Sequence, residues 1–406
     1  MTLMSKNFDR RTFMRGAALL PFAAQLRAAS WLPSGVPRTL IVLELEGGND
    51  GLNTVIPLED ANYVRLRPRL SAVKQTAVPI GNGMGLHMSL GKLAQRVQAG
   101  SCAIVSNVGY PKPDRSHFKC RDIWHSADPQ CKQVRAVTTG WLGRAADLLA
   151  ATSGGMKAVE IGGTEIPLLL RARNSVGLSL RRVEDFVLWA GDSAAHAKRR
   201  AALQELLAQR TAQGLLGYVA EVANEALVQS SQLSAALKNY QQKATYPDTQ
   251  LARSLQLIAR MVIAGFGTRL FHLGYGGFDT HARQLPTQQS LLRELDEALA
   301  AFAQDLEAHG YFSQTAVLVH SEFGRRVMEN ESLGTDHGAA APLFVLSGGV
   351  RGGLHGVAPD LADLDDGDLK FKTDFRSVYQ DLLVWLGCDA TAVLGGEFAP
   401  VGLFQS

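Results

Sequence analysis

Three short segments in the last third of the chain are rich in aspartate, glutamate and histidine. They are Gly277-Phe278-Asp279-Thr280-His281, Ser321-Glu322-Phe323-Gly324-Arg325 and Thr335-Asp336-His337-Gly338. Carboxylate oxygens and imidazole nitrogens are ligands that divalent metals prefer. Each segment lies beside a strand-like or glycine-rich stretch, and an α/β fold presents such residues in loops at the carboxyl ends of its strands. The pattern indicates a metal-dependent hydrolase without specifying its substrate.

Five apolar runs rich in β-branched residues are the elements that must position these segments. The predicted strands are Thr39 to Leu45, Cys102 to Val108, Thr268 to Leu273, Thr315 to His320 and Pro342 to Leu346. Helical patterns alternate with them, which is typical of a parallel sheet covered by helices on both faces. We therefore predict an α/β fold with a doubly wound, mostly parallel sheet.

Long amphipathic helices are expected in addition to this alternation. Between about residues 194 and 265, leucines and other apolar residues recur at helical spacing, which indicates packing surfaces. We interpret this region as a helical insertion within one α/β domain that spans residues 30–406. A further long helix is predicted from Leu285 to His309, after the first acidic segment.

Paired arginines mark the N-terminus. Arg10 and Arg11 precede Thr12-Phe13, and an apolar run extends from Gly16 to Leu26. This layout is typical of a twin-arginine export signal, and the run is too short for a stable transmembrane span. We predict that residues 1–29 are a signal peptide, that the twin-arginine export machinery is a partner, and that the protein is periplasmic or otherwise exported. The alternative is an ordinary basic tail.

The charge of the chain argues against nucleic acid as a partner. The formal net charge of +3 includes the basic signal segment, so the mature domain is close to neutral. No basic stripe with interleaved aromatic residues is present in the sequence either. The four cysteines lack the paired spacing of a structural zinc site.

Several motifs together resemble the bacterial family called domain of unknown function 1501, over nearly the whole mature chain. Besides the three acidic segments, they are Leu45-Glu46-Gly47-Gly48-Asn49-Asp50-Gly51-Leu52-Asn53-Thr54, Asp114-Arg115-Ser116-His117-Phe118, Gly140-Trp141-Leu142-Gly143-Arg144 and Thr373-Asp374-Phe375-Arg376. That family is similar to the alkaline phosphatase superfamily, which includes sulfatases and cofactor-independent phosphoglycerate mutases. The resemblance implies a metal centre at the carboxyl edge of a doubly wound sheet.

The superfamily pattern implies ligands in the first and middle loops. Asp50 matches the acidic ligand after the first strand, with Glu46 as the alternative. Asp279 and His281 match the middle-loop pair. The alternative for this pair is a turn cap and a surface histidine.

The late loops match the superfamily pattern only in part. Glu322 can replace the usual aspartate as a ligand, but Phe323 cannot replace the usual histidine, which puts a complete two-zinc site in doubt. Asp336 and His337 stand in the place of the final histidine. They are expected to complete a site with Asp279 and His281, and Glu322 is expected to form a weaker second site with Asp50.

Ser116 is the candidate nucleophile. It precedes a helical pattern, where helix N-terminal amides and the Arg115 guanidinium could hold a phosphate or sulfate. The alternative is that Ser116 is only a helix N-cap and His117 a structural partner. Arg325 is a candidate anion clamp, and the alternative is a buried ion pair with Glu322.

Two functions follow as hypotheses. The first is an exported hydrolase of small-molecule or glycan phosphate or sulfate esters that uses zinc or manganese, with calcium as a further alternative. The second is a catalytically degenerate relative that acts as a periplasmic binding or assembly protein. Phe323 in the usual histidine position favours the second. The many acidic and histidine residues in loops favour the first, because carboxylates gathered in one cleft repel one another without a cation.

Overall fold

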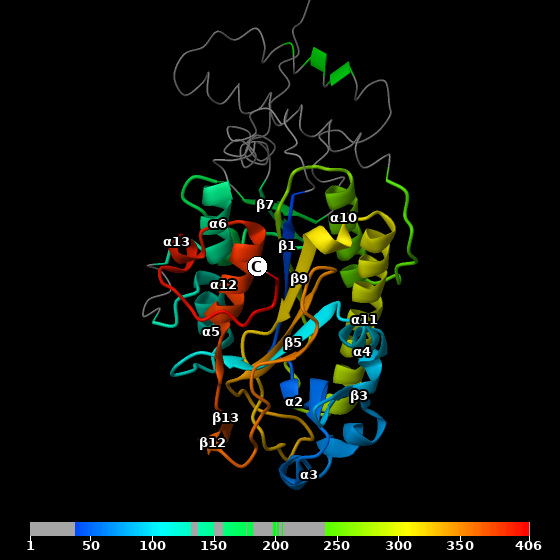
Figure 1. Ribbon diagram of the computed structural model, residues 1–406, viewed down its shortest axis with the longest axis vertical. Coiled ribbons are helices and arrows are strands. Elements are labelled where there is room, and N and C mark those ends of the chain that lie inside the picture. The colour runs from blue at the N-terminus through cyan, green and yellow to red at the C-terminus, as the bar shows by residue number, and fades with distance from the viewer. Residues whose placement is uncertain are drawn as a thin grey trace, which may run out of the picture.

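The computed structural model describes residues 37–130, 137–149, 157–175, 177–181, 198–199, 201–202, 205 and 240–405 (Figure 1). The expected signal peptide lies outside these residues, as does most of the insertion expected between residues 194 and 265. Among the described residues, no helix is both long enough and apolar enough to cross a membrane.

A nine-stranded sheet forms the centre of the fold. Its strands are β1 (Thr39–Leu45), β5 (Cys102–Gly109), β6 (Ala158–Ile161), β7 (Gly177–Leu180), β8 (Leu270–Tyr275), β9 (Thr315–His320), β10 (Ala341–Leu346), β11 (Gly353–His355) and β14 (Thr373–Asp374). The order is β11-β5-β10-β9-β1-β8-β6-β7, with β14 also paired to β5. β10 runs antiparallel to β5 and β9, and the other pairs are parallel. The predicted mostly parallel sheet is confirmed.

Helices cover both faces of the sheet, as predicted (Figure 1). On one face lie α4 (Gly91–Gln98), α10 (Gln250–Ile263) and α11 (Gln284–Ala308). On the other lie α5 (His117–Ser126), α6 (Trp141–Leu149), α12 (Phe375–Leu386) and α13 (Ala390–Leu394). Alternate side chains of β1 pack into the two layers: Ile41 and Leu43 join the first core, and Leu40 and Val42 join the second. Burial on both faces explains why this strand is almost continuously apolar.

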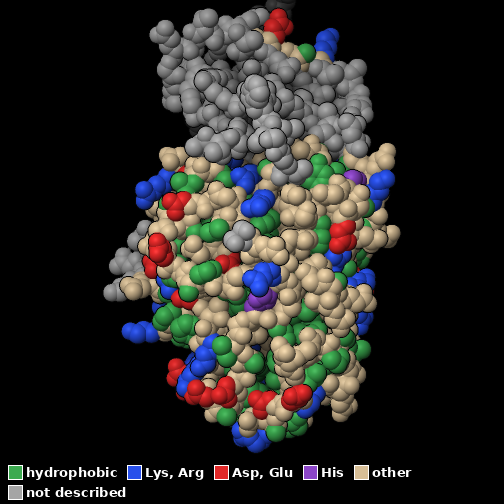
Figure 2. All heavy atoms as spheres, in the orientation of Figure 1, with side chains coloured by type: hydrophobic (Ala, Val, Ile, Leu, Met, Phe, Trp, Pro, Cys, Tyr) green, Lys and Arg blue, Asp and Glu red, His purple; other side chains and the backbone are tan. Residues whose placement is uncertain are grey.

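Short elements connect the main strands and helices. They are α2 (Gly51–Thr54), α3 (Ala61–Leu66), a three-stranded sheet of β2 (Val55–Pro57), β3 (Val78–Gly81) and β4 (Met84–Leu86), the hairpin β12 (Leu364–Asp365) and β13 (Asp368–Leu369), and 3-10 segments at Leu70–Thr76, Met88–Leu90, Leu168–Leu170 and Phe312–Gln314. Figure 2 shows acidic and basic side chains side by side over the hairpin, where Asp366 pairs with Arg115 and Arg326.

Candidate metal centre

The loops that follow β1, β8 and β9 meet at one edge of the sheet. β1 pairs in parallel with β8 on one side and with β9 on the other, so the three carboxyl ends point the same way. The first two loops touch closely, because a Cβ added at Gly47 would lie 2.4 Å from the backbone nitrogen of Asp279. Gly47 also has a φ of +113°, which glycine adopts readily. Glycine at this position therefore permits the close approach.

Three side chains from two of the acidic segments converge at this edge. Asp279 Oδ1 lies 3.0 Å from His281 Nε2 and 3.1 Å from His337 Nε2, and the two imidazole nitrogens are 2.9 Å apart. The corners of a triangle with sides of this length lie about 1.7 Å from its centre, within the ~2.0–2.1 Å reach of a zinc–nitrogen or zinc–oxygen bond. These three residues, all expected from the sequence, are therefore spaced to share one divalent cation.

His117 is a fourth side chain at the same point. It begins α5, and its Nε2 lies 3.6 Å from Asp279 Oδ2. One ligand atom from each of His117, Asp279 and His337 lies within 4.8 Å of the others. His117 was not predicted as a ligand from the sequence, where it was considered only as a structural partner. The one signal that could have identified it was its place in the Asp114-Arg115-Ser116-His117-Phe118 motif.

Each of the three imidazoles is oriented through its Nδ1 atom. His337 Nδ1 lies 2.9 Å from the carbonyl oxygen of Arg115, His117 Nδ1 lies 2.8 Å from Glu322 Oε1, and His281 Nδ1 lies 3.2 Å from Asp336 Oδ1. A carbonyl or carboxylate oxygen can only accept, so Nδ1 must donate its proton in each case. In the neutral rings, every Nε2 then presents a lone pair toward Asp279.

This convergence of lone pairs calls for a cation. Two unprotonated Nε2 atoms 2.9 Å apart, both beside a carboxylate oxygen, repel one another unless a proton or a metal ion lies between them. Carboxylate-oriented imidazoles are the usual arrangement around protein-bound metals. The donor set of imidazole nitrogens and one carboxylate suits zinc or manganese, and it does not suit calcium, which takes oxygen ligands.

Glu322 and Asp336 contact the histidines of the centre from the side opposite Asp279, through the Nδ1 atoms. Glu322 is fully buried and accepts hydrogen bonds from the backbone nitrogens of Gly47, at 2.8 Å, and Gly48, at 3.1 Å. Its Oε2 also accepts from Ser321 Oγ at 3.2 Å, and its Oε1 orients His117. Asp336 similarly contacts His281 and accepts from Asn330 at 3.2 Å. Both carboxylates, predicted from the sequence as direct ligands, thus contact the Nδ1 atoms of histidines instead.

Asp50 lies apart from the converging side chains. Its Oδ2 forms an ion pair with Arg67 Nη1 at 2.6 Å, and both side chains are buried. It also accepts from Gln284, whose oxygen in turn accepts from Thr335. The structure does not bring Asp50 together with Glu322 as the expected second site. Arg67 neutralises the buried carboxylate of Asp50. The sequence pattern does not show that these two residues are in contact.

Arg325 binds the backbone of the surrounding loops. Its buried guanidinium donates to the carbonyl oxygens of Gly48 at 2.6 Å, Thr335 at 2.7 Å and Phe278 at 3.1 Å, and also to that of Gly47. A further bond of 2.6 Å reaches Asp279 Oδ1. The expected role as an anion clamp requires free N–H groups, and these contacts occupy the guanidinium. The geometry makes Arg325 a positioning residue for Asp279.

The charge on Asp279 is stabilised by these contacts. Partial burial would raise its pKa, but the hydrogen bond from Arg325, together with one from His337 when its Nε2 carries a proton, outweighs that effect and lowers the pKa to about 2. The side chain is 49 % exposed, so the carboxylate is both ionised at neutral pH and open to solvent. A ligand or substrate can therefore reach this side of the centre.

The segment before α5 borders the same centre. Ser116 is the N-cap residue of α5, and its exposed side chain makes no capping hydrogen bond. Its neighbours on both sides contact the centre, Arg115 through its carbonyl oxygen and His117 through its ring. The Arg115 guanidinium is paired with Asp368 at 2.7 Å and with Asp366 at 3.2 Å. Ser116 thus has a free hydroxyl beside the centre, whereas Arg115 is already engaged.

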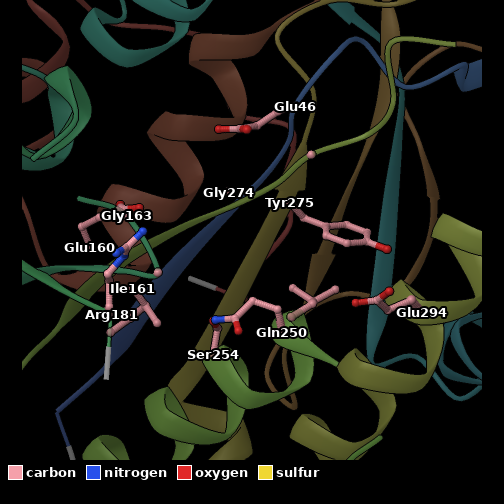
Figure 3. A pocket seen from close by; sticks show the side chains of 13 residues that line it. Glu46, Glu160, Ile161, Gly163, Arg181, Gln250, Ser254, Gly274, Tyr275 and Glu294 are labelled. Atoms are coloured by element: carbon pink, nitrogen blue, oxygen red, sulfur yellow. The ribbon is translucent and has the colours of Figure 1, made fainter. Parts of the chain in front are cut away.

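A cavity of about 740 Å³ lies beside β6 and β8 (Figure 3). Its charged lining consists of Glu46, Glu160 and Glu294 with Arg181, and none of the converging histidines contributes to it. An acidic lining repels a phosphate or sulfate group. Glu46, the alternative first ligand, lines this cavity and pairs with Arg121 at 3.4 Å.

Comparison with solved structures finds distant similarity to several proteins. A sulfatase, PsFucS1, from Pseudoalteromonas sp. is 10% identical, with 94% of this chain and 72% of that chain covered and a TM-score of 0.37. The lipoteichoic acid synthase LtaP from Listeria monocytogenes is 9% identical, with 91% and 74% covered and a TM-score of 0.36. The alkaline phosphatase from the Antarctic bacterium TAB5 is 10% identical, with 78% and 93% covered and a TM-score of 0.31. These values are too low to support an argument about chemistry.

The family comparison is more specific. No curated protein matches the sequence. Residues 103–399, which include α5, the loop after β8 and both late acidic segments, match the model of a family described as "Protein of unknown function (DUF1501)". The match covers well over half of the chain, and the protein belongs to this family.

Proposed function

We propose that this protein is an exported, metal-dependent hydrolase of phosphate or sulfate esters. The observation that carries the proposal is the convergence of Asp279 Oδ1, His281 Nε2 and His337 Nε2 within 3.1 Å of one another. His117 joins from α5. The metal-binding atoms of these four side chains, which come from three separate segments, meet at one partly exposed point. Such partial exposure is typical of a catalytic site rather than a closed structural site.

His281, His337, Asp279 and His117 would hold the ion, which we expect to be zinc or manganese. A bound divalent ion supplies Lewis acidity to an ester oxygen and lowers the pKa of a hydroxyl group. Arg325 keeps Asp279 in place, and Glu322 and Asp336 keep their histidines turned toward it. Such prior orientation of ligands reduces the reorganisation needed during reaction.

Ser116 is the proposed nucleophile. Its Oγ would form a bond to the phosphorus or sulfur atom while the bond to the alcohol oxygen breaks, and the departing alcohol takes up a proton. Water then cleaves the serine ester, which releases phosphate or sulfate and restores the hydroxyl. The exposed, uncapped Ser116 side chain between Arg115 and His117 supports this role. Arg115 could hold the anion only by exchanging its pairing with Asp366 and Asp368.

A binding protein without turnover is the second candidate. Phe323 is buried, and its ring centroid lies 4.9 Å from that of His117 and 4.6 Å from that of His337. An apolar ring thus occupies the space beside two histidines where a further ligand would otherwise fit. Phe118, the residue after His117, is 82% exposed and offers an apolar contact near the centre. A periplasmic binding or assembly role would use these features.

The twin-arginine pattern in residues 10–15 supports export of the folded, metal-loaded chain. We propose a small-molecule or glycan ester as the substrate. Fusion of residues 1–40 to a reporter that acts only after twin-arginine export would test the route, with Arg10→Lys, Arg11→Lys as the matched control. Export that persists in this control would contradict the proposal.

Elemental analysis tests the hydrolase directly. Protein purified without chelators or metal resin is compared with the His281→Ala, His337→Ala variant, and His355→Ala serves as a control because His355 contacts the Arg351 carbonyl. We expect the double variant alone to lose one metal ion together with hydrolysis of aryl phosphates or sulfates. Metal that is lost without any parental turnover favours the binding protein. Identical metal content in all three proteins contradicts the proposed centre.

A further inference from the structure

A second group of metal-binding side chains lies inside the protein. Glu44 is on β1, His272 on β8 and His125 on α5, and these residues are 0%, 4% and 3% exposed. Glu44 Oε2 lies 2.9 Å from His125 Nε2 and 3.4 Å from His272 Nε2. One ligand atom of each residue lies within 4.8 Å of the other two. None of the three takes part in the centre described above.

The contacts around these residues direct their ligand atoms inward. Glu160, on β6, accepts from Nδ1 of His272, which turns Nε2 of that ring toward Glu44. Arg121 Nε donates to Glu44 Oε1 at 3.2 Å, which leaves Oε2 facing the two imidazoles. A carboxylate that orients a histidine through its far nitrogen is a common second layer around protein-bound zinc.

We propose that Glu44, His125 and His272 bind a divalent transition metal, zinc in particular, in a buried site separate from the surface centre. Two imidazole nitrogens and a carboxylate oxygen are zinc ligands, and neighbouring ligand atoms in a tetrahedral zinc site lie about 3.3 Å apart. The separations of 2.9 Å from Glu44 Oε2 to His125 Nε2 and 3.4 Å to His272 Nε2 fit that spacing. An ion here would tie α5 to two neighbouring strands of the central sheet.

The acidic cavity offers the ion a route inward. Glu160 lines the cavity (Figure 3) and also contacts His272, so it lies between the cavity and the buried residues. Glu46 lines the same cavity and pairs with Arg121, the residue that contacts Glu44. Carboxylates in a cleft raise the local concentration of cations. The cavity therefore suits the entry of a metal ion better than that of an anionic ester.

Without a metal, the same residues form a charged network. Burial disfavours a charged imidazole, but Glu160 and Glu44 outweigh that effect and raise the pKa of His272 to about 10. The His272 cation and Arg121 then balance the two glutamates. Both ring nitrogens of His272 face carboxylate oxygens and so carry protons in this network, and a metal ion bound at Nε2 must displace one of them. Proton release on metal binding therefore distinguishes the metal-loaded site from the metal-free network.

The first test uses the His281→Ala, His337→Ala variant, in which the surface centre is disabled and the buried residues are untouched. We expect this variant to retain one zinc ion per chain after brief dialysis against a chelator. Prolonged chelation with denaturant, followed by refolding and zinc titration in weak buffer, should release a proton on binding. A variant without zinc, which also binds none on titration, overturns the proposal.

The second test adds Glu44→Gln or His125→Gln to the same background. Each should abolish the retained zinc, whereas Glu294→Gln, a cavity-lining control outside the cluster, should not. Glu160→Gln should weaken zinc affinity about 10–100-fold, because it orients His272 without binding the ion. Zinc retained at full affinity by folded Glu44→Gln and His125→Gln variants overturns the assignment. If either fails to fold, the first test still decides.

The two proposed sites can fail independently. A parent protein that holds only the ion removed by His281→Ala, His337→Ala supports the surface centre and overturns the buried site. A parent that holds only an ion resistant to that double substitution supports the buried site and contradicts the proposed hydrolase centre.

Discussion

His281 Nε2 and His337 Nε2 face each other at 2.9 Å. The Nδ1 atom of His281 contacts Asp336, and that of His337 contacts the carbonyl oxygen of Arg115. Both contacts require a proton on Nδ1. A neutral imidazole carries only one proton, so each facing Nε2 then has a lone pair. Asp279 adds a carboxylate to the same place. A proton or a divalent ion between these atoms would relieve their repulsion.

Weakening the support of His117 should weaken metal binding. Glu322→Gln removes the charge that orients this ring and is expected to lower metal affinity about 10–100-fold, measured by competition with a chromogenic chelator. Glu329→Gln is the matched control, because Glu329 also accepts two backbone N–H bonds but lies against Arg69 and Leu70. Equal affinity in both variants would contradict a role for Glu322 at the centre.

Replacement of Asp50 should affect stability and leave metal content unchanged. Asp50→Asn leaves Arg67 buried without its counter-charge, which should cost about 3–5 kcal/mol in the free energy of unfolding. The exposed pair of Asp248 and Arg253 is the control, and Asp248→Asn should change stability by about 0–1 kcal/mol. Loss of metal from a folded Asp50→Asn variant would show instead that Asp50 acts as a ligand, as the sequence resemblance implied.

Ser116→Ala separates the nucleophile from the helix cap. The side chain makes no capping bond, so we expect stability to change by less than about 0.5 kcal/mol. Turnover of the best ester should fall about 10³-fold or more with metal content unchanged. Thr249→Ala provides a true cap control, since Thr249 accepts from Ala252 at 3.2 Å and its loss should cost about 1 kcal/mol. Full turnover in Ser116→Ala would exclude this serine as the nucleophile.

Acid should remove the contribution of Asp279 to stability. Its pKa is lowered to about 2 in the folded protein, below the unfolded value of about 3.9, so the stabilisation is present above that value and is lost as the pH falls through about 2. Denaturant unfolding of chelated parent and Asp279→Asn proteins should therefore differ near pH 5 and converge near pH 2. A difference that stays constant over this range would contradict the ionic role.

Local sequence patterns predicted the sheet well. The predicted strands at Thr39 to Leu45 and Thr315 to His320 match β1 and β9 residue for residue, and the helix predicted from Leu285 to His309 is shifted by one residue from α11. Buried parallel strands must be apolar on both faces, which makes them visible as continuous runs. Glu44 interrupts the first run, and that single acidic residue was the available signal for the buried cluster.

Residue types and their positions after predicted strands indicated the candidate metal ligands. Asp279, His281 and His337 were predicted in this way, because type and position after a strand are local properties. The contacts of each side chain, in contrast, depend on segments that are distant in the sequence. Arg67, α5 and the glycine loop after β1 approach from distant parts of the chain, and they turn Asp50 into an ion-pair partner and Glu322 into a support for His117. Such roles depend on the orientation of each side chain, and contacts between segments distant in the sequence set that orientation.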